Sequence, residues 1–119
     1  MEEWIKKLGE GWASLDPASV MELFDRENIK YYEEATDEPV TDWEGVKELW
    51  DVVPSNQKDV EFSSKIICQK DDYAIVNWQV TRYSINKKAK QLKDGIFEIR
   101  LNKSGKCIYF KQWVSTKEI

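Results

Sequence analysis

Apolar and polar residues alternate one by one through the last third of the chain. Phe97 and Ile99 alternate with charged residues, and a second apolar series follows a polar turn at residues 102–105. Alternation with a period of two on both sides of a turn that contains glycine predicts an antiparallel hairpin with one buried face. Gln112 interrupts the second series. A polar side chain at a core-facing position needs a hydrogen-bonding partner, water or a ligand.

Two earlier segments show the same period. Val60 and Phe62 share one face of the first segment. The second segment continues from Ala74 to Val80, after a turn expected at Asp71. Each segment predicts a strand, so we expect four long antiparallel strands in the second half of the chain.

The first half of the chain has apolar residues at helical spacing. Residues 2–14 predict an amphipathic helix. Asp16 before a proline is typical of the start of a helix, and this second helix is expected to end near Arg26. Residues 28–34 are rich in strand-forming types, and a third helix should follow them and stop at Pro54.

This order of elements predicts an α+β fold, in which three N-terminal helices pack on one face of a curved, mostly antiparallel sheet. The length of 119 residues is that of one domain, spanning residues 1–119, and it suffices for one hydrophobic core. The residues expected to face the helices are Phe97, Ile99, Phe110 and Val114.

Charge is distributed unevenly along the chain. Residues 1–61 contain 17 acidic and 6 basic side chains, whereas residues 62–119 contain 5 acidic and 12 basic ones. The net charge of −4 argues against nucleic acid as a partner, because proteins that bind it carry a basic surface. We interpret the lysines between residues 87 and 93 as a solvated hairpin tip, with an anion site as the alternative.

The residue inventory also argues against some kinds of site. Histidine is absent and the chain has two separated cysteines, Cys68 and Cys107, so we expect free thiols, no metal site and no cofactor. No apolar stretch reaches about 20 residues, and the N-terminal segment is charged, so we expect neither a membrane span nor a secretory signal. Free thiols without a signal indicate the cytoplasm.

Three segments carry a resemblance to a known family. They are LDPASVMELF at residues 15–24, EPVTDWEGVKELW at 38–50 and GIFEIRLNKSGKCIYFKQW at 95–113. With the order of elements, they resemble the nuclear transport factor 2-like superfamily and, within it, the SnoaL-like proteins related to polyketide cyclases and ketosteroid isomerases. The resemblance implies a cystatin-like cone, whose concave sheet face and helices enclose a hydrophobic pocket, commonly in a homodimer.

Ketosteroid isomerases in this superfamily use a general base and two hydrogen-bond donors. Counting back from the third helix places Glu38 at the base position, whereas counting forward from the second helix places Tyr32 there. The donor positions correspond to Leu8 and Phe97, which cannot donate a hydrogen bond to an enolate. The resemblance therefore argues against steroid-type isomerisation.

Limonene epoxide hydrolases, also in this superfamily, activate water with an arginine and two aspartates. The matching positions hold Trp78, Val80 and Gln112, and an amide cannot take a proton from water. Two classes of function stay open. We favour a domain that binds a small hydrophobic or aromatic molecule without catalysis; the alternative is an isomerase or cyclase that uses Glu38 as general base.

The expected pocket is apolar with one neutral hydrogen-bonding group. Its lining is expected to be Trp12, Tyr32, Trp50, Trp78, Phe97, Phe110 and Gln112. Such a pocket suits a flat, uncharged or weakly polar ligand. The alternatives are that the tryptophans only pack the core and that Gln112 bonds to the main chain. Arg82 is expected on a solvated rim, but if it turns inward it can hold a carboxylate.

Aromatic residues also occupy the opposite parity of the strands. Tyr83, Tyr109 and Trp113, together with Ile75, are expected on the outer face of the sheet. Aromatic residues on an outer face indicate that the face is covered. We therefore predict a homodimer contact on this face, with scattered surface aromatics as the alternative.

Overall fold

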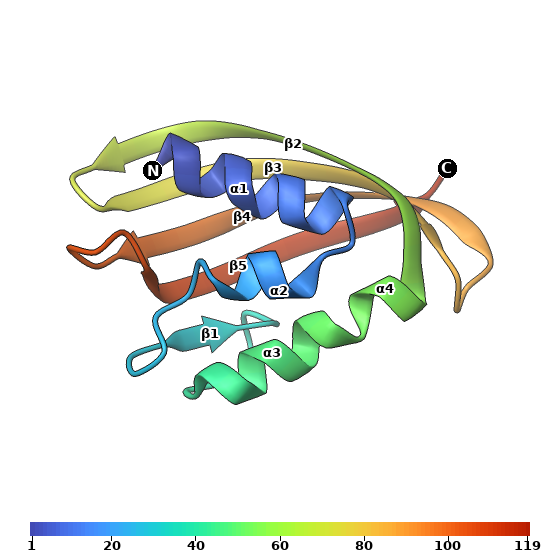
Figure 1. Cartoon of the computed structure of the whole chain (residues 1–119). Coiled ribbons are helices and arrows are strands. Elements are labelled where there is room, and N and C mark those ends of the chain that lie inside the picture. Colours follow the sequence, from blue (N-terminus) through green and yellow to red (C-terminus); the bar gives the residue numbers. More distant parts are fainter.

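The computed structural model describes the whole chain, from Met1 to Ile119, as a layer of helices on one face of a curved five-stranded sheet (Figure 1). This α+β architecture confirms the predicted fold class. The elements in chain order are α1 (Glu2–Ala13), α2 (Pro17–Met21), β1 (Lys30–Tyr32), α3 (Trp43–Asp51), α4 (Val53–Asn56), β2 (Gln57–Lys70), β3 (Tyr73–Ser84), β4 (Ala89–Leu101) and β5 (Cys107–Glu118).

The sheet has the strand order β1-β5-β4-β3-β2. Strands β2 to β5 form antiparallel pairs, and the short β1 runs parallel to β5, with Tyr31 opposite Phe110. In Figure 1 the sheet curves around α1 and α2, which lie over its concave face. The concave face and the helices therefore enclose the interior of the molecule.

The period-two pattern of the sequence places the core as predicted. Phe97, Ile99 and Phe110 are at most 1% exposed, and Val114 packs against the edge of the core. All four side chains face the helical layer. Burial of this apolar surface is the main favourable contribution to folding.

The second helix begins where the sequence predicts and ends earlier. Asp16 caps α2, as expected, but the helix ends at Met21 instead of near Arg26. After this point the main chain pairs with the start of β5, because the Cys107 amide donates to the Leu23 carbonyl oxygen at 2.8 Å. Backbone groups that pair with a strand cannot also complete helical hydrogen bonds.

The elements around β1 and α3 differ from their predicted ends. β1 covers only three residues of the expected 28–34, because the chain turns back and Tyr31 exchanges two main-chain hydrogen bonds with Val40. Helix α3 ends at Asp51, and Pro54 lies in the first turn of α4, which is a single helical turn. Proline is tolerated there because the first turn leaves its amide positions unpaired.

The predicted hairpin turns are present. Gly105 has φ of +80°, in the left-handed region that glycine adopts without strain, and its amide donates to the Asn102 carbonyl oxygen at 2.9 Å. Asp71 also has positive φ, at 55°, and turns the chain between β2 and β3. Aspartate tolerates this conformation better than most residues do.

Both cysteines are free thiols, as predicted. Cys68 is exposed, whereas Cys107 is buried and burial raises the pKa of its thiol. None of the helices is both long and apolar enough to cross a membrane.

Candidate functional site

A cavity lies between the helices and the concave face of the sheet, near the point where α4 leads into β2. Its volume is about 150 Å³, which holds roughly one benzene-sized group. Fifteen residues from helices, strands and the segment after β1 line it: Trp12, Tyr31, Glu33, Glu34, Leu49, Trp50, Val53, Gln57, Trp78, Arg82, Lys93, Phe97, Phe110, Gln112 and Val114.

Aromatic rings form the inner part of this cavity. The Trp78 ring stacks on Phe97 with centroids 4.7 Å apart, and Trp12 contacts both Trp50 and Trp78 at 5.5 and 5.6 Å. Trp78 lies close against Gly95, where a Cβ atom would come within 2.9 Å of the indole ring. Rings in mutual contact have few alternative positions, so this wall presents flat apolar surfaces in a fixed arrangement.

Two of the buried tryptophans have no hydrogen-bond acceptor. Trp4, Trp12 and Trp43 each donate from Nε1 to a protein oxygen, at 2.9 to 3.1 Å. Trp50 and Trp78 are 7% and 1% exposed, and their Nε1 atoms have no partner. A buried donor without an acceptor costs about 1–3 kcal/mol. Both residues line the cavity.

Two cationic side chains stand at the cavity wall on neighbouring strands. Arg82 and Lys93 are half-buried, and neither lies within 4.0 Å of a carboxylate oxygen, since the ion pairs of the chain, Lys6–Glu10 and Lys47–Asp51, lie elsewhere. Burial lowers the pKa of the Arg82 guanidinium. Burial and the charge of Arg82 lower the pKa of Lys93.

Acidic and phenolic groups from β1 and the segment after it form another part of the cavity wall. Burial raises the pKa of Tyr31 well above its ordinary value, and nearby Glu33 adds to this effect. Burial and the charge of Glu34 raise the pKa of Glu33. Glu33 is still exposed over more than a third of its surface, so solvent screening limits the effect. The Tyr31 hydroxyl also lies near the Trp50 indole without reaching hydrogen-bond geometry.

Gln112 bonds to the main chain, one of the two alternatives that the sequence left open, and it also lines the cavity. Its Nε2 atom donates to the Glu33 carbonyl oxygen at 2.8 Å, so the amide holds the segment after β1 against β5. The same side chain lines the cavity, and its Oε1 atom accepts no hydrogen bond from the protein. The interruption of the apolar pattern is therefore a fixed polar group at the cavity wall.

Most of the residues expected in the pocket line this one cavity. They are Trp12, Trp50, Trp78, Phe97, Phe110 and Gln112, and Arg82, which was expected on the rim, lines the cavity with them. Tyr32 and Glu38 do not line it. Tyr32 lies on the outer side of β1, where its ring is 5.8 Å from that of Tyr109 and 4.6 Å from Lys111 Nζ. Glu38 is an exposed residue of the segment between β1 and α3.

The cavity also contains residues that the sequence analysis did not place there. Tyr31 faces inward because it shares the parity of buried Ile29, a signal that the sequence already contained. Lys93 shares the parity of Phe97 on the same strand, so alternation alone could have placed it inside. Glu33 follows the end of β1, where no periodic pattern applies. The charged side chains of Lys93 and Glu33 make the lining more polar than that of the apolar pocket that the sequence predicted.

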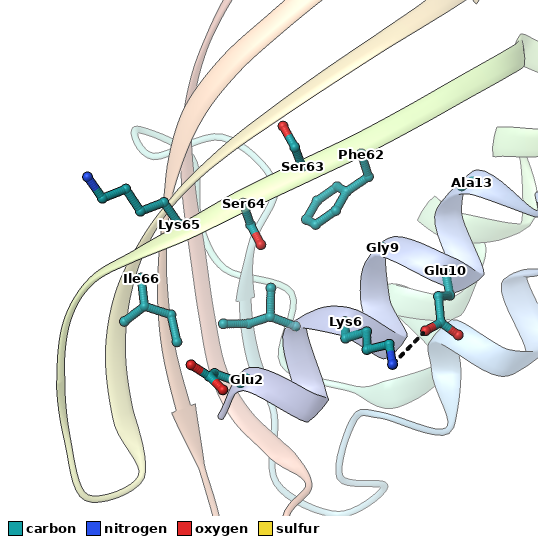
Figure 2. Close-up of a pocket in the computed structure, with 11 residues that line it drawn as sticks. Glu2, Lys6, Gly9, Glu10, Ala13, Phe62, Ser63, Ser64, Lys65 and Ile66 are labelled. Atoms are coloured by element: carbon teal, nitrogen blue, oxygen red, sulfur yellow. Dashed lines mark ion pairs between the residues drawn. The ribbon is translucent and has the colours of Figure 1, made fainter.

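A larger groove lies on the surface between α1 and β2, with a volume of about 720 Å³. Figure 2 shows Phe62 and Ser64 on the β2 side and the ion pair of Lys6 with Glu10, at 4.0 Å, on the helix side. The charged groups are exposed, and none of the lining atoms is a buried donor or acceptor without a partner. The groove therefore offers less to a specific ligand than the cavity does. No cluster of three or more potential metal ligands is present.

The comparisons with known proteins identify the fold. No family model and no curated protein matches the sequence. Among solved structures, the chain is similar to SalBIII, an epoxide hydrolase/cyclase-like enzyme with a role in pyran ring formation in the polyether salinomycin. The TM-score is 0.84 at 11% identity, over 99% of this chain and 95% of the other.

Two further structures agree with this result. An NTF2-like protein of unknown function from Exiguobacterium has a TM-score of 0.76 at 15% identity, over 94% of this chain and 98% of the other. A protein with a ketosteroid isomerase-like fold from Catenulispora acidiphila, solved with trimethylamine, has a TM-score of 0.77 at 11% identity, over 93% and 84%. The chain thus has the nuclear transport factor 2-like fold that its sequence resemblance predicted.

Proposed function

We propose that this protein binds a small, flat organic molecule in the cavity between its helices and the concave face of the sheet. The observation that carries the proposal is the pair of buried indole N–H groups, from Trp50 and Trp78, that line an aromatic cavity without any acceptor. A carbonyl or hydroxyl oxygen of a ligand would accept from them while its ring packs on the aromatic wall. The volume of about 150 Å³ limits the enclosed part to a single ring.

A pair of neighbouring valines provides the test of this binding site. Val53 lines the cavity, whereas Val52 is 51% exposed. Val53→Phe should fill the cavity and abolish binding of single-ring fragments, detected by ligand-observed NMR and quenching of tryptophan fluorescence. Val52→Phe is the matched control and should bind as the wild type does. The proposal is rejected if no single-ring fragment binds the wild type, or if Val53→Phe binds fragments unchanged.

A second candidate function is proton transfer, favoured by the position of Glu33. Its carboxylate lines the same cavity, and burial raises its pKa, which makes it a better base near neutral pH. It would remove a proton from a carbon next to a carbonyl, and an indole N–H of Trp50 or Trp78 would stabilise the enolate oxygen. This arrangement assigns to Glu33 the role that the sequence resemblance implied for Glu38.

Exchange of hydrogen for deuterium tests this candidate. A cyclic ketone that binds the protein should exchange its α-protons in D₂O faster than the free ketone does, as followed by NMR. Glu33→Gln should abolish the acceleration, whereas Glu38→Gln, on the same segment, should retain it. Absence of acceleration for every ketone that binds would leave the protein as a binding domain. Loss of acceleration in Glu38→Gln alone would return the base to the position that the resemblance implied.

We also propose that the outer face of the sheet forms a homodimer contact. Trp113 is 42% exposed on this face, and Ile75 and Tyr83 are partly exposed beside polar neighbours. Lys111 Nζ lies 5.1 Å from the Trp113 ring, so this aromatic surface also carries charge. Light scattering should report a dimer that Trp113→Asp combined with Tyr109→Asp converts to a monomer. A wild-type monomer at tens of micromolar would reject the contact.

A further inference from the structure

The guanidinium of Arg82 is held at one edge and open at the other. Its Nε atom donates to Gln91 Oε1 at 3.2 Å, and Gln91 is 4% exposed and directly opposite Arg82 in the sheet. The two terminal nitrogens of Arg82 form no hydrogen bond with the protein. Because Gln91 is buried, it restrains the guanidinium plane, and Arg82 lines the cavity with its two terminal nitrogens unpaired.

A half-buried guanidinium normally has a carboxylate partner, and Arg82 has none. Desolvation of a cation is unfavourable unless an anion or several acceptors compensate for it. The free nitrogens have the spacing that binds both oxygens of one carboxylate, which is the geometry that makes arginine a carboxylate receptor.

Lys93 adds a second cation on the same face of the sheet. It pairs with Val80, two residues from Arg82, and its Nζ donates to Thr116 Oγ1 at 2.9 Å. The two positive charges repel each other, and an anion bound between them would be attracted to both. Glu34 and Glu33 raise the pKa of Lys93 and so oppose part of the effect of burial and of Arg82, whereas burial lowers the pKa of Arg82.

We propose that the natural ligand is a compact ring carboxylate whose carboxylate binds to the free edge of Arg82. Its ring packs on the aromatic wall, and a further oxygen accepts from Trp50 or Trp78. Gln91 acts as a positioning residue, because it touches Arg82 and not the ligand. This inference rests on the proposed binding function and narrows the ligand from a flat molecule to an anionic one.

Benzoate and benzamide are the probes, because they share a ring and a planar substituent and differ in charge. Dissociation constants at neutral pH and low salt should show that the wild type binds benzoate roughly tenfold more tightly than benzamide, as one charge-assisted bidentate pair would give. Added salt should weaken binding of benzoate and leave benzamide unaffected. Arg82→Met should remove the preference while benzamide binds as before.

Three further variants keep the test interpretable. Arg82→Lys keeps a positive charge but lacks the two parallel N–H donors of the guanidinium. It should fold and show a reduced preference for benzoate over benzamide. Gln91→Glu places a carboxylate against Arg82 and should remove the preference with benzamide binding intact, which a merely structural role would not produce. Lys117→Met, at an exposed position of β5, is the matched charge control and should keep the wild-type ratio.

The outcomes separate the two proposals. Equal affinity of the wild type for both probes would overturn the proposal that Arg82 binds a carboxylate, but it would not contradict the proposed binding function. A preference for benzoate that persists in a folded Arg82→Met variant would also overturn the proposed role of Arg82. If neither probe binds, the ring-carboxylate proposal fails, whereas the proposed binding function fails only if no single-ring fragment binds.

Discussion

The concave face of the sheet has two halves that differ in the side chains they point inward, although the same alternation of inward and outward residues runs through both. Near the β2–β3 and β4–β5 turns, at the left of Figure 1, the inward residues are apolar and closed over by helices; we call this the core half (Ala74, Val76, Ile99 and Leu101). Toward the β3–β4 hairpin lies the mouth half (Arg82, Gln91 and Lys93, with Gln112 at its border, opposite Phe97). Between the two halves stand Trp78 and Phe97.

The two halves differ in whether their polar groups have hydrogen-bonding or charged partners. The four named side chains of the core half are apolar and at most 8% exposed, so packing satisfies them completely. In the mouth half and at its border, two indole N–H groups lack acceptors and a guanidinium lacks an anion. Unmet polar groups reduce stability in the free protein and favour a ligand that satisfies them. Packing in the core half therefore stabilises the fold, whereas the unmet groups of the mouth half support the binding function proposed above.

The largest expected loss of stability comes from truncating a side chain in the core half. Ile99 has no exposed surface, so Ile99→Ala should lower the free energy of unfolding by about 2–5 kcal/mol. Lys93→Met, in the mouth half of the same strand, should change it by less than about 1 kcal/mol, because the apolar stem is kept. Urea denaturation measures both. Equal losses in the two variants would contradict the division of the face.

A second comparison uses two tryptophans that contact each other. Trp12 donates to Gln57 Oε1 at 2.9 Å, whereas Trp50 has no acceptor. Trp12→Phe and Trp50→Phe remove similar volume, but only the first leaves a buried acceptor unpaired. Trp12→Phe should therefore be the less stable variant by about 1–3 kcal/mol. If Trp50→Phe is equally or more destabilised, then the Trp50 N–H has a partner in solution.

Gln112 tests the border between structure and binding. Gln112→Leu removes the hydrogen bond to the Glu33 carbonyl oxygen, and it should lower the free energy of unfolding by about 0.5–1.5 kcal/mol while the fold is kept. Binding of a ring probe should weaken by a similar amount, because the segment that carries Glu33 loses its anchor. Thermal denaturation and a titration of the same sample measure the two effects. Complete unfolding would show that Gln112 is a core residue only.

The smallest expected effect depends on pH. Burial raises the pKa of Glu33 above its ordinary value of 4.5, so the folded state binds this proton more tightly than the unfolded chain. Its contribution to stability is full below pH 4.5 and is lost as the pH rises through the folded pKa. Glu33→Gln should thus gain stability relative to the wild type between acidic and neutral pH. The gain should be small, because solvent screens the carboxylate. A loss at neutral pH would reverse the assigned sign.

Alternation in the sequence predicted the strands and the core half, because every inward residue there is apolar. It was less able to predict the mouth half. Arg82 and Lys93 continue the inward parity, but charge near a strand end also suggests solvent, and periodicity cannot separate the two. Tyr31 and Tyr32 are adjacent, and a shift of one residue exchanges the faces of a strand. The end of α2 depends on pairing with Cys107, a contact that is distant in the sequence.

The most direct test of the account is the set of indole N–H signals in a ¹H–¹⁵N spectrum, recorded while benzoate or benzamide is added. The signals are assigned by single Trp→Phe variants. We expect the signals of Trp50 and Trp78 to shift most, because these groups gain an acceptor. The signals of Trp4 and Trp43 should stay unchanged, because their N–H groups already donate to protein oxygens. Shifts confined to exposed Trp113, or no shift at saturating probe, would contradict the claim that the mouth half binds a ligand.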